Sequence, residues 1–444
     1  MKKSALVRKL CGVVVCLVFV MALFCGSAAA LFIVALPSYE SVADDLNSLG
    51  LFKGSDLGYE LERAPKRVEA GTMLLRLLGL EEVALAGDYE HPFTDVPVWA
   101  DKIVGYLYEN NLTNGISETL FGSDNECDAR MYVTFVLRAL GYSDKDGDFT
   151  YAEAVEFGMS VGVIDDFILG TKYRIPQSED PFTFTFDTRF LRGHMTAVSL
   201  LALYAATSDG EYDTLLAKLI AEGVVDAGAA KPILEHNQYY NELKALFPEE
   251  RTNISYDVKT NTDTWDSGRV DFYLNVAYRM DGEEMLLSMD IAAPMLEGHE
   301  GSMRYKDGYM YISDLNKKER QQMSQEDALF LFEENLVWIG IDFVPTPVYT
   351  IASVTKETEG EYTVYTETRD SSLGAFQKRG DGFYSTGMLR TVTKYYFNKG
   401  GQLVKIIYET KNDEHTEVAN FKFGEDVKIV FPEDLDSYVD VSEF

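Results

Sequence analysis

The stretch that decides the fold of the amino-terminal half reads Phe93-Thr94-Asp95-Val96-Pro97-Val98-Trp99-Ala100, and a helical pattern follows it. Up to residue 108, the apolar residues recur at helical spacing: Ile103, Val104, Leu107 and Tyr108. A turn is expected at Asn114-Gly115. A second amphipathic helix should then end at Gly141, which suits a C-cap. The unit is therefore a helix, a glycine-bounded loop and a second helix.

This unit recurs along the chain. Residues 75–79 read Leu-Arg-Leu-Leu-Gly and residues 137–141 read Leu-Arg-Ala-Leu-Gly, while residues 50–54 correspond in the same way to residues 111–115. A third, divergent unit is expected from helices at 149–162 and from residue 191 onward, separated by an aromatic-rich loop at 182–186. We therefore predict three helical repeats and a helical connector. Their ranges are 39–80, 91–142, 148–206 and, for the connector, 207–250.

The repeats resemble a known family. Residues 93–100 resemble the Phe-x-Asp-Val-x-x-x-Trp-Ala opening of S-layer homology (SLH) repeats, with one residue fewer before the tryptophan. Residues 66–70 (Lys-Arg-Val-Glu-Ala) and the helix after them resemble the Thr-Arg-Ala-Glu signature, although the first unit lacks the Phe-x-Asp-Val opening. The resemblance implies an all-α bundle of three prongs. It also implies non-covalent binding of a secondary cell-wall polysaccharide, often pyruvylated, in the grooves between the prongs.

The candidate glycan-binding residues follow from this resemblance. Arg67 and Arg192 take the signature arginine position, where a guanidinium suits a carboxylate on an acidic glycan. In the second unit Ala129 stands at that position and Arg130 lies one place further on, so we expect one or two of the three grooves to bind.

Three further residues complete the candidate site: Trp99, Gly54 and Gly115. Each motif residue also has a plain structural reading. Arg67 would then be an exposed charge at a helix start, or a partner of Glu69 or Glu62, and Trp99 would be a core residue. His194, beside Arg192, is expected at the surface or at a groove rim.

Charge and the amino terminus indicate where the protein works. The chain has 40 Lys and Arg against 72 Asp and Glu, a net charge of −32 that argues against nucleic acid as a partner. A basic start at residues 2–9, an apolar run at 10–36 and small residues at 26–30 predict a signal peptide over 1–30. We therefore expect a secreted protein of the cell wall or cell surface; the alternative is an uncleaved membrane anchor.

The carboxy-terminal part, residues 252–444, changes to strand-like alternation with hairpin turns at 306–308 and 398–401. We expect one strongly curved antiparallel sheet with a covering helix at about 325–336, and so a multidomain α+β protein. Residues 303–312 resemble a hairpin of the LolA/LppX-like half-barrel superfamily, whose members carry lipids in the concavity. A hydrophobic ligand would then be lined by Met285, Met289, Met295, Met303, Met310 and Trp338. The alternative is an ordinary core.

No catalytic motif stands out. The five His residues are scattered, and no metal-ligand spacing, nucleophile elbow or phosphate loop occurs. We predict no enzymatic activity, no cofactor and no metal, although the many carboxylates leave a wall-acting hydrolase as an alternative. The favoured hypothesis is a wall-anchored surface protein that displays a β-rich module. The runner-up is a carrier or sensor of a hydrophobic ligand.

Overall fold

The computed structural model describes residues 34–442, except for 166–167, 170–189, 248–252, 265–267, 293–299, 315–316, 330–346, 375–376, 380–381, 385–386 and 411–414. The predicted signal peptide, the aromatic loop at 182–186, Met295 and Trp338 therefore lie outside the described residues. In the described part of the chain, no helix is both long and apolar enough to cross a membrane.

The chain divides into two compact units. The first, here called the helical unit, comprises Ser38–Asn237 and Val348–Ala352. The second, here called the sheet unit, comprises Met1–Pro37, Gln238–Pro347 and Ser353–Phe444. The coarse prediction of an α+β protein is confirmed, because helices build the first unit and a large sheet builds the second.

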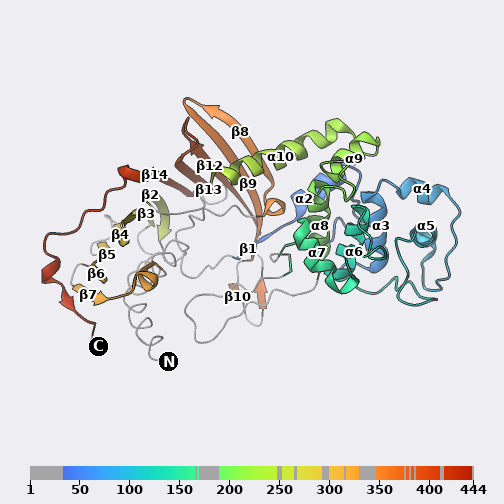
Figure 1. The fold of residues 1–444 in the computed structure, drawn as a ribbon, viewed down its shortest axis with the longest axis horizontal. Helices are drawn as coiled ribbons and strands as arrows, with labels where there is room; N and C mark the ends of the chain where they lie inside the picture. The colour runs from blue at the N-terminus through green and yellow to red at the C-terminus, as the bar shows by residue number, and fades with distance from the viewer. Residues whose placement is uncertain are drawn as a thin grey trace. The chain divides into compact units, whose positions relative to one another are not determined.

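The helical unit consists of short helices joined by loops (Figure 1). They are α2 (Glu40–Ser48), α3 (Arg67–Leu77), α4 (Glu81–Ala86), α5 (Asp101–Glu109), α6 (Ala129–Ala139), α7 (Ala154–Val161), α8 (Arg192–Tyr204), α9 (Leu215–Ala221) and the first part of α10 (Ala227–Leu246). Short 3-10 turns also belong to it: η1 (Val98–Ala100), η2 (Tyr151–Glu153) and η3 (Val348–Thr350).

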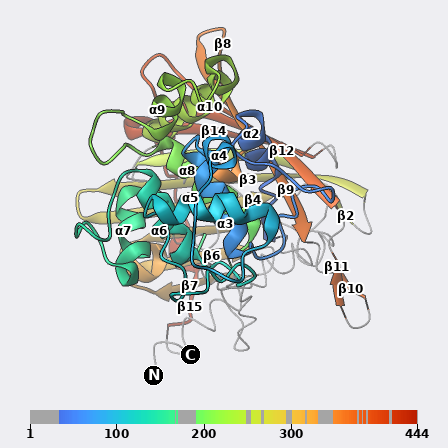
Figure 2. The same ribbon diagram turned by 90° about the vertical axis from the view of Figure 1, so that its right-hand side faces the viewer.

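Helices of different predicted repeats pack against one another. Helix α3 packs on α5, α6 packs on α7, and α8 packs back on α2. Each contact joins the second helix of one predicted repeat to the first helix of another, so the three pairs close a ring. Figure 2 shows α6 between α3 and α7. The repeat boundaries themselves stay predictions.

A small residue allows one of these close approaches. A Cβ atom on Gly71 of α3 would lie 2.8 Å from Cδ1 of Leu107 of α5, so a larger side chain would require the Leu107 side chain to move. The buried interior around this contact is apolar and continuous, and its largest side chains include Phe52, Met73, Leu74, Leu75, Leu107 and Tyr132.

A segment distant in sequence completes the helical unit. Tyr349 of η3 is 1% exposed, and its hydroxyl donates to both carboxylate oxygens of Asp165, at 2.6 and 2.7 Å. Its ring stacks on Tyr39, with 6.3 Å between the centroids, and Tyr39 in turn meets His194 edge to face. Residues 348–352 therefore belong to the core of a unit whose other residues lie before position 238.

The sheet unit is built on one 13-stranded sheet. Its strands are β1 (Val34–Pro37), β2 (Ile254–Thr264), β3 (Gly268–Asp281), β4 (Glu284–Ala292), β5 (Glu300–Lys306), β6 (Tyr309–Asp314), β7 (Lys318–Gln322), β8 (Ser353–Glu359), β9 (Tyr362–Gly374), β12 (Gly387–Phe397), β13 (Leu403–Thr410), β14 (His415–Phe423) and β15 (Val439–Asp440). The order is β1-β9-β12-β13-β14-β2-β3-β4-β5-β6-β7-β15, with β8 also paired to β9. Strands β10 (Gln377–Arg379) and β11 (Gly382–Tyr384) form a separate hairpin.

One detail of the predicted sheet needs correction. The sheet is mixed, because β15 pairs with β7 in parallel while its other neighbouring strands run antiparallel. A strand that pairs with one far away in the sequence can run in either direction. The alternation of apolar and polar residues within a strand does not reveal which direction it takes. The predicted covering helix at 325–336 is helical over residues 325–329, and residues 330–336 lie outside the described part.

The end of α10, which the sequence places in the connector, packs on this sheet. In the sheet unit, Lys356 Nζ and the Tyr365 hydroxyl both donate to Glu242 Oε2 of α10, at 2.7 and 2.9 Å. Just after the helix, Phe247 packs edge to face on Tyr395 of β12. The first half of α10 belongs to the helical unit and its second half to the sheet unit. This helix therefore contributes residues to both units.

We predict that Tyr349→Ala loosens the helical unit by about 3–5 kcal/mol, the usual cost of truncating a buried aromatic residue. Hydrogen exchange of the α2 and α8 amides in the full chain measures the effect. Tyr273→Ala in the sheet unit is the control, because Tyr273 is 41% exposed. Equal protection of α2 and α8 in both variants would show that residues 348–352 do not stabilise the unit.

Candidate functional site

The two signature arginines occupy the same place in the fold. Arg67 opens α3 and Arg192 opens α8. The backbone N–H of Arg67 donates to the Asn125 carbonyl at 2.9 Å, and that of Arg192 donates to the Arg63 carbonyl at 2.8 Å. Ala129 opens α6 in the same way, which agrees with its assignment to the arginine position of the second repeat.

The Arg67 guanidinium lies in a closed, mostly apolar environment. Its side chain is buried, with Cζ 5.1 Å from the ring centroid of Phe121 and 5.5 Å from that of Phe135. Nη2 donates to Thr113 Oγ1 at 3.2 Å, and Nη1 contacts Met131 Sδ at 3.6 Å. Aromatic faces attract the cation, but they do not replace a carboxylate.

The charge of Arg67 is incompletely compensated. No ion pair joins it to any carboxylate in the part of the chain that the structure describes, and its Nε atom has no hydrogen-bond partner there. Burial lowers the pKa of Arg67, although a guanidinium remains charged. The Ser123 hydroxyl, also buried, has no partner among these residues either. A buried cation with spare donors is suited to binding an anion.

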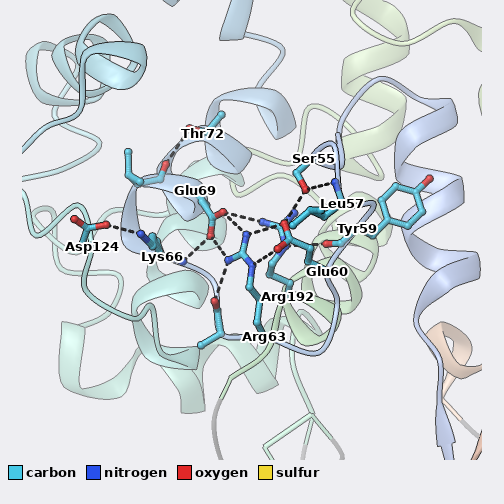
Figure 3. A network of polar contacts seen from close by, with 12 residues as sticks. Ser55, Leu57, Tyr59, Glu60, Arg63, Lys66, Glu69, Thr72, Asp124 and Arg192 are labelled. Carbon is cyan, nitrogen blue, oxygen red and sulfur yellow. Dashed lines mark hydrogen bonds and ion pairs between the residues drawn. The ribbon is translucent and has the colours of Figure 1, made fainter.

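Arg192 is equally buried but is paired, as Figure 3 shows. Its Nη1 lies 3.3 Å from Glu69 Oε1, its Nε donates to the Tyr59 carbonyl at 2.9 Å, and Cζ is 5.3 Å from the Phe52 ring centroid. Arg63 also binds Glu69, through Nη2 to Oε1 at 2.7 Å and Nη1 to Oε2 at 2.9 Å.

Asp95 organises the loop beside Arg67, and the sequence analysis did not select it. Its carboxylate accepts the backbone N–H groups of Phe121, Gly122 and Ser123 at 2.7, 2.7 and 3.1 Å. Burial raises the pKa of Asp95, but these bonds outweigh it and leave the pKa below its usual value. The Ser123 carbonyl in turn accepts the Val68 N–H of α3. Its place as the acidic residue of the Phe-x-Asp-Val pattern is the sequence signal from which this role could have been found.

The two candidate glycines lie in loops that approach the arginines. The Gly115 N–H donates to Thr113 Oγ1, the hydroxyl that also accepts from Arg67. Gly115 has a φ of +71°, and a Cβ there would lie 2.4 Å from the Phe93 ring, so only glycine fits. Gly54 lies in the loop before Tyr59, and a Cβ on it would lie 2.8 Å from the Gly58 carbonyl oxygen.

Trp99 and Arg130 lie apart from these contacts. Trp99 is 58% exposed in η1, so its interpretation as a core residue is wrong. Arg130 is exposed on α6, with Cζ 5.9 Å from the Tyr151 ring centroid. No contact described for Trp99 or Arg130 reaches the Arg67 or Arg192 guanidinium. Their part in a glycan site stays a prediction.

His194 is half-buried at the start of α8. It is two residues after Arg192 on α8, and its Nδ1 accepts the Leu191 backbone N–H at 3.2 Å. Burial lowers its pKa to about 4, because the charged imidazolium would lose its hydration. The half-buried ring is neutral at pH 7 and helps to cap α8, and its expected position at a groove rim stays a prediction.

Comparison with known proteins gives partial matches. No family model matches the chain. It is 30% identical over 130 residues to a "Cell surface protein" of Thermoanaerobacter kivui, a match that covers 28% of this chain and 17% of the relative. It is 29% identical over 106 residues to a "Middle cell wall protein" of Brevibacillus brevis, covering 23% and 10%. The chain thus matches only a small part of either relative's length.

Among solved structures, LprF from Mycobacterium bovis matches with a TM-score of 0.27 and 12% identity, covering 45% of this chain and 98% of that one. The lipoprotein LppX of Mycobacterium tuberculosis matches with a TM-score of 0.23 and 10% identity, covering 46% and 100%. A LolA superfamily protein from Nitrosomonas europaea matches with a TM-score of 0.17 and 12% identity, covering 44% and 94%. Scores this low carry no argument about ligand or function.

We predict a pH-dependent contribution of His194 to the helical unit. Its folded pKa of about 4 lies below the ordinary value of 6.5, so the unfolded chain binds the proton more tightly. The stabilisation is complete above pH 6.5 and is lost as the pH falls toward 4, by up to about 3 kcal/mol.

His194→Asn keeps a side-chain acceptor but does not titrate in this range. The free energy of unfolding of α8, from hydrogen exchange, should therefore fall more for the parent protein than for His194→Asn between pH 7 and 4.5. A constant difference between the two proteins would contradict the assignment.

Proposed function

We propose that this protein is an exported surface protein that attaches non-covalently to an acidic cell-wall polysaccharide through its helical unit. The observation that carries the proposal is the buried Arg67 guanidinium, which has no carboxylate partner among the described residues. The unit thereby holds a fixed cation, next to a loop and aromatic rings, whose counter-ion no described residue supplies.

The composition of the chain makes this observation informative. With 72 acidic residues against 40 basic ones, the chain offers an abundant supply of carboxylates for any arginine. Burying an unpaired cation costs several kcal/mol. A carboxylate supplied by a ligand would offset that cost with charge-assisted hydrogen bonds, and Thr113 and Ser123 place hydroxyl groups nearby for neutral sugar oxygens.

Three further observations support a surface role. The matched relatives are named as a cell surface protein and a middle cell wall protein. Residues 1–30 have the pattern of an export signal, with an uncleaved membrane anchor as the alternative. Helices that exchange between three predicted repeats fit the bundle that the SLH resemblance implies. The polymer that the resemblance implies is a secondary cell-wall polysaccharide, for which a pyruvate ketal would supply the carboxylate.

We predict that Arg67→Met lowers retention on purified cell walls about tenfold or more, because charged hydrogen bonds to a ligand are lost. The same change should leave the helical unit as stable as before or more stable, since it removes a buried charge. Cosedimentation with walls measures retention, and hydrogen exchange of α3 measures stability.

Lys231→Met is the control for charge, because it also removes one cation from the helical unit but at an exposed position on α10. Full retention of Arg67→Met, or equal recovery of the parent protein on walls stripped of the polysaccharide, would contradict the proposal.

A second candidate function for the sheet unit is binding of a hydrophobic ligand. The strand register places Met289 opposite Met303, and Met310 opposite Tyr305, on one face of the sheet. Met285, Met289, Met303 and Met310 are all buried. Flexible thioether side chains adapt to apolar molecules of varied shape, although they equally suit a core.

Native mass spectrometry of the purified full chain tests this second function. A co-purifying lipid should be present in the parent protein and lost on Met289→Gln, which places a polar amide on that face. Met159→Gln on α7 is the control, because Met159 is 38% exposed. If the parent protein carries no apolar ligand, this second function is contradicted and the buried methionines are ordinary core residues.

A further inference from the structure

The Arg67 and Arg192 sites share several features but differ in their acidic partner. Both arginines open a helix, both are buried, and both have an aromatic ring at 5.1 to 5.3 Å. Each donates to one neutral oxygen, Thr113 Oγ1 for Arg67 and the Tyr59 carbonyl for Arg192. The difference is Glu69, whose carboxylate lies 3.3 Å from Arg192 Nη1.

We infer that Glu69 is a built-in occupant of the Arg192 site, so that this site is closed to acidic ligands and the Arg67 site alone takes them. The inference rests on the proposed function, and it states which of the two arginine sites can take an acidic ligand. It makes Glu69 a residue that determines how many acidic groups the protein binds.

The position of Glu69 is fixed by bonds on several sides (Figure 3). Its Oε2 accepts the Lys66 backbone N–H at 2.7 Å as part of the cap of α3, and both its oxygens accept from Arg63. Burial raises the pKa of Glu69, but the Arg63 bonds, the Lys66 bond and the Arg192 charge outweigh it and leave the pKa below its usual value. The carboxylate therefore stays ionised and in place at neutral pH.

The charges of the two sites follow from these contacts. Around Arg192, the guanidinium groups of Arg63 and Arg192 meet the carboxylates of Glu60 and Glu69. The four charges cancel, so an incoming carboxylate would add an uncompensated negative charge to a partly buried cluster. Around Arg67, the same carboxylate would neutralise a cation that has no described acidic partner.

Glu69 closes the other site because of where it lies on α3. It is two residues after Arg67 but does not pair with it; instead it reaches the arginine that opens α8. The matching position holds His194 on α8 and Met131 on α6, and neither is an acid. Only one of the three predicted repeats therefore supplies such an internal anion.

The test uses Glu69→Gln in the full chain. Glutamine keeps the shape and can still accept the Lys66 N–H, but it removes the negative charge. Asp434→Asn is the control, because it removes the acid of an exposed ion pair with Lys318 in the sheet unit. The probe is a methyl glycoside carrying a 4,6-pyruvate ketal. Its stoichiometry is measured by isothermal titration calorimetry, and each site is followed through the ¹⁵N-labelled Nε signals of Arg67 and Arg192.

We expect one probe molecule per parent chain or Asp434→Asn chain, with only the Arg67 signal moving. Glu69→Gln should bind two molecules and move both signals. Arg67→Met should bind none, and Arg67→Met combined with Glu69→Gln should regain one through Arg192. Arg192→Met alone, which leaves Glu69 untouched, should bind as the parent does.

The alternative outcomes separate the two ideas. If the parent binds one molecule and Glu69→Gln still binds one, or if Arg192→Met lowers binding by the parent, the closed Arg192 site is refuted and the wall-binding proposal stands. If neither the parent nor Glu69→Gln binds the probe or cell walls, the proposed function fails and the inference fails with it.

Discussion

The helical unit depends on backbone hydrogen bonds between the start of one helix and a loop from elsewhere in the chain. The Arg67 N–H is bonded to the Asn125 carbonyl, and the Arg192 N–H to the Arg63 carbonyl. Helix starts have unsatisfied N–H groups, and here loops of another predicted repeat satisfy them. The same contacts bring α3 against α5 and α8 against α2. A single repeat would expose both its polar helix start and its apolar face, so the repeats stabilise one another.

This packing between predicted repeats also explains why the two arginines are buried and need counter-ions. A side chain at the first position of such a helix points into the junction between repeats, where it is removed from water. Arginine tolerates this place because aromatic rings and neutral oxygens surround it, yet its charge still requires a counter-ion. Glu69 supplies one for Arg192, whereas no described residue supplies one for Arg67. The cost of burying that cation is the physical basis for assigning it a ligand.

The sequence predicted the outline of the site better than its details. Arg67 opens a helix, and the Gly115 N–H shares the Thr113 hydroxyl with it, while the glycan-binding role of these residues stays a prediction. The core alternative for Trp99 is wrong, because an aromatic residue after Pro97 and Val98 is apolar without showing which side of the 3-10 turn faces water. The partial burial of His194 depends on Tyr39 and Phe190, which lie close only in the folded chain.

The pattern of residues alone predicted helices in the amino-terminal half and strands in the carboxy-terminal half, because hydrophobic periodicity is a local property. It was also enough to place an arginine at the start of two equivalent helices. Folding decided which acid meets which arginine, that residues 348–352 complete the helical unit, and that β15 pairs in parallel with β7. These features join residues separated by more than a hundred positions, and neither spacing nor composition records such a contact.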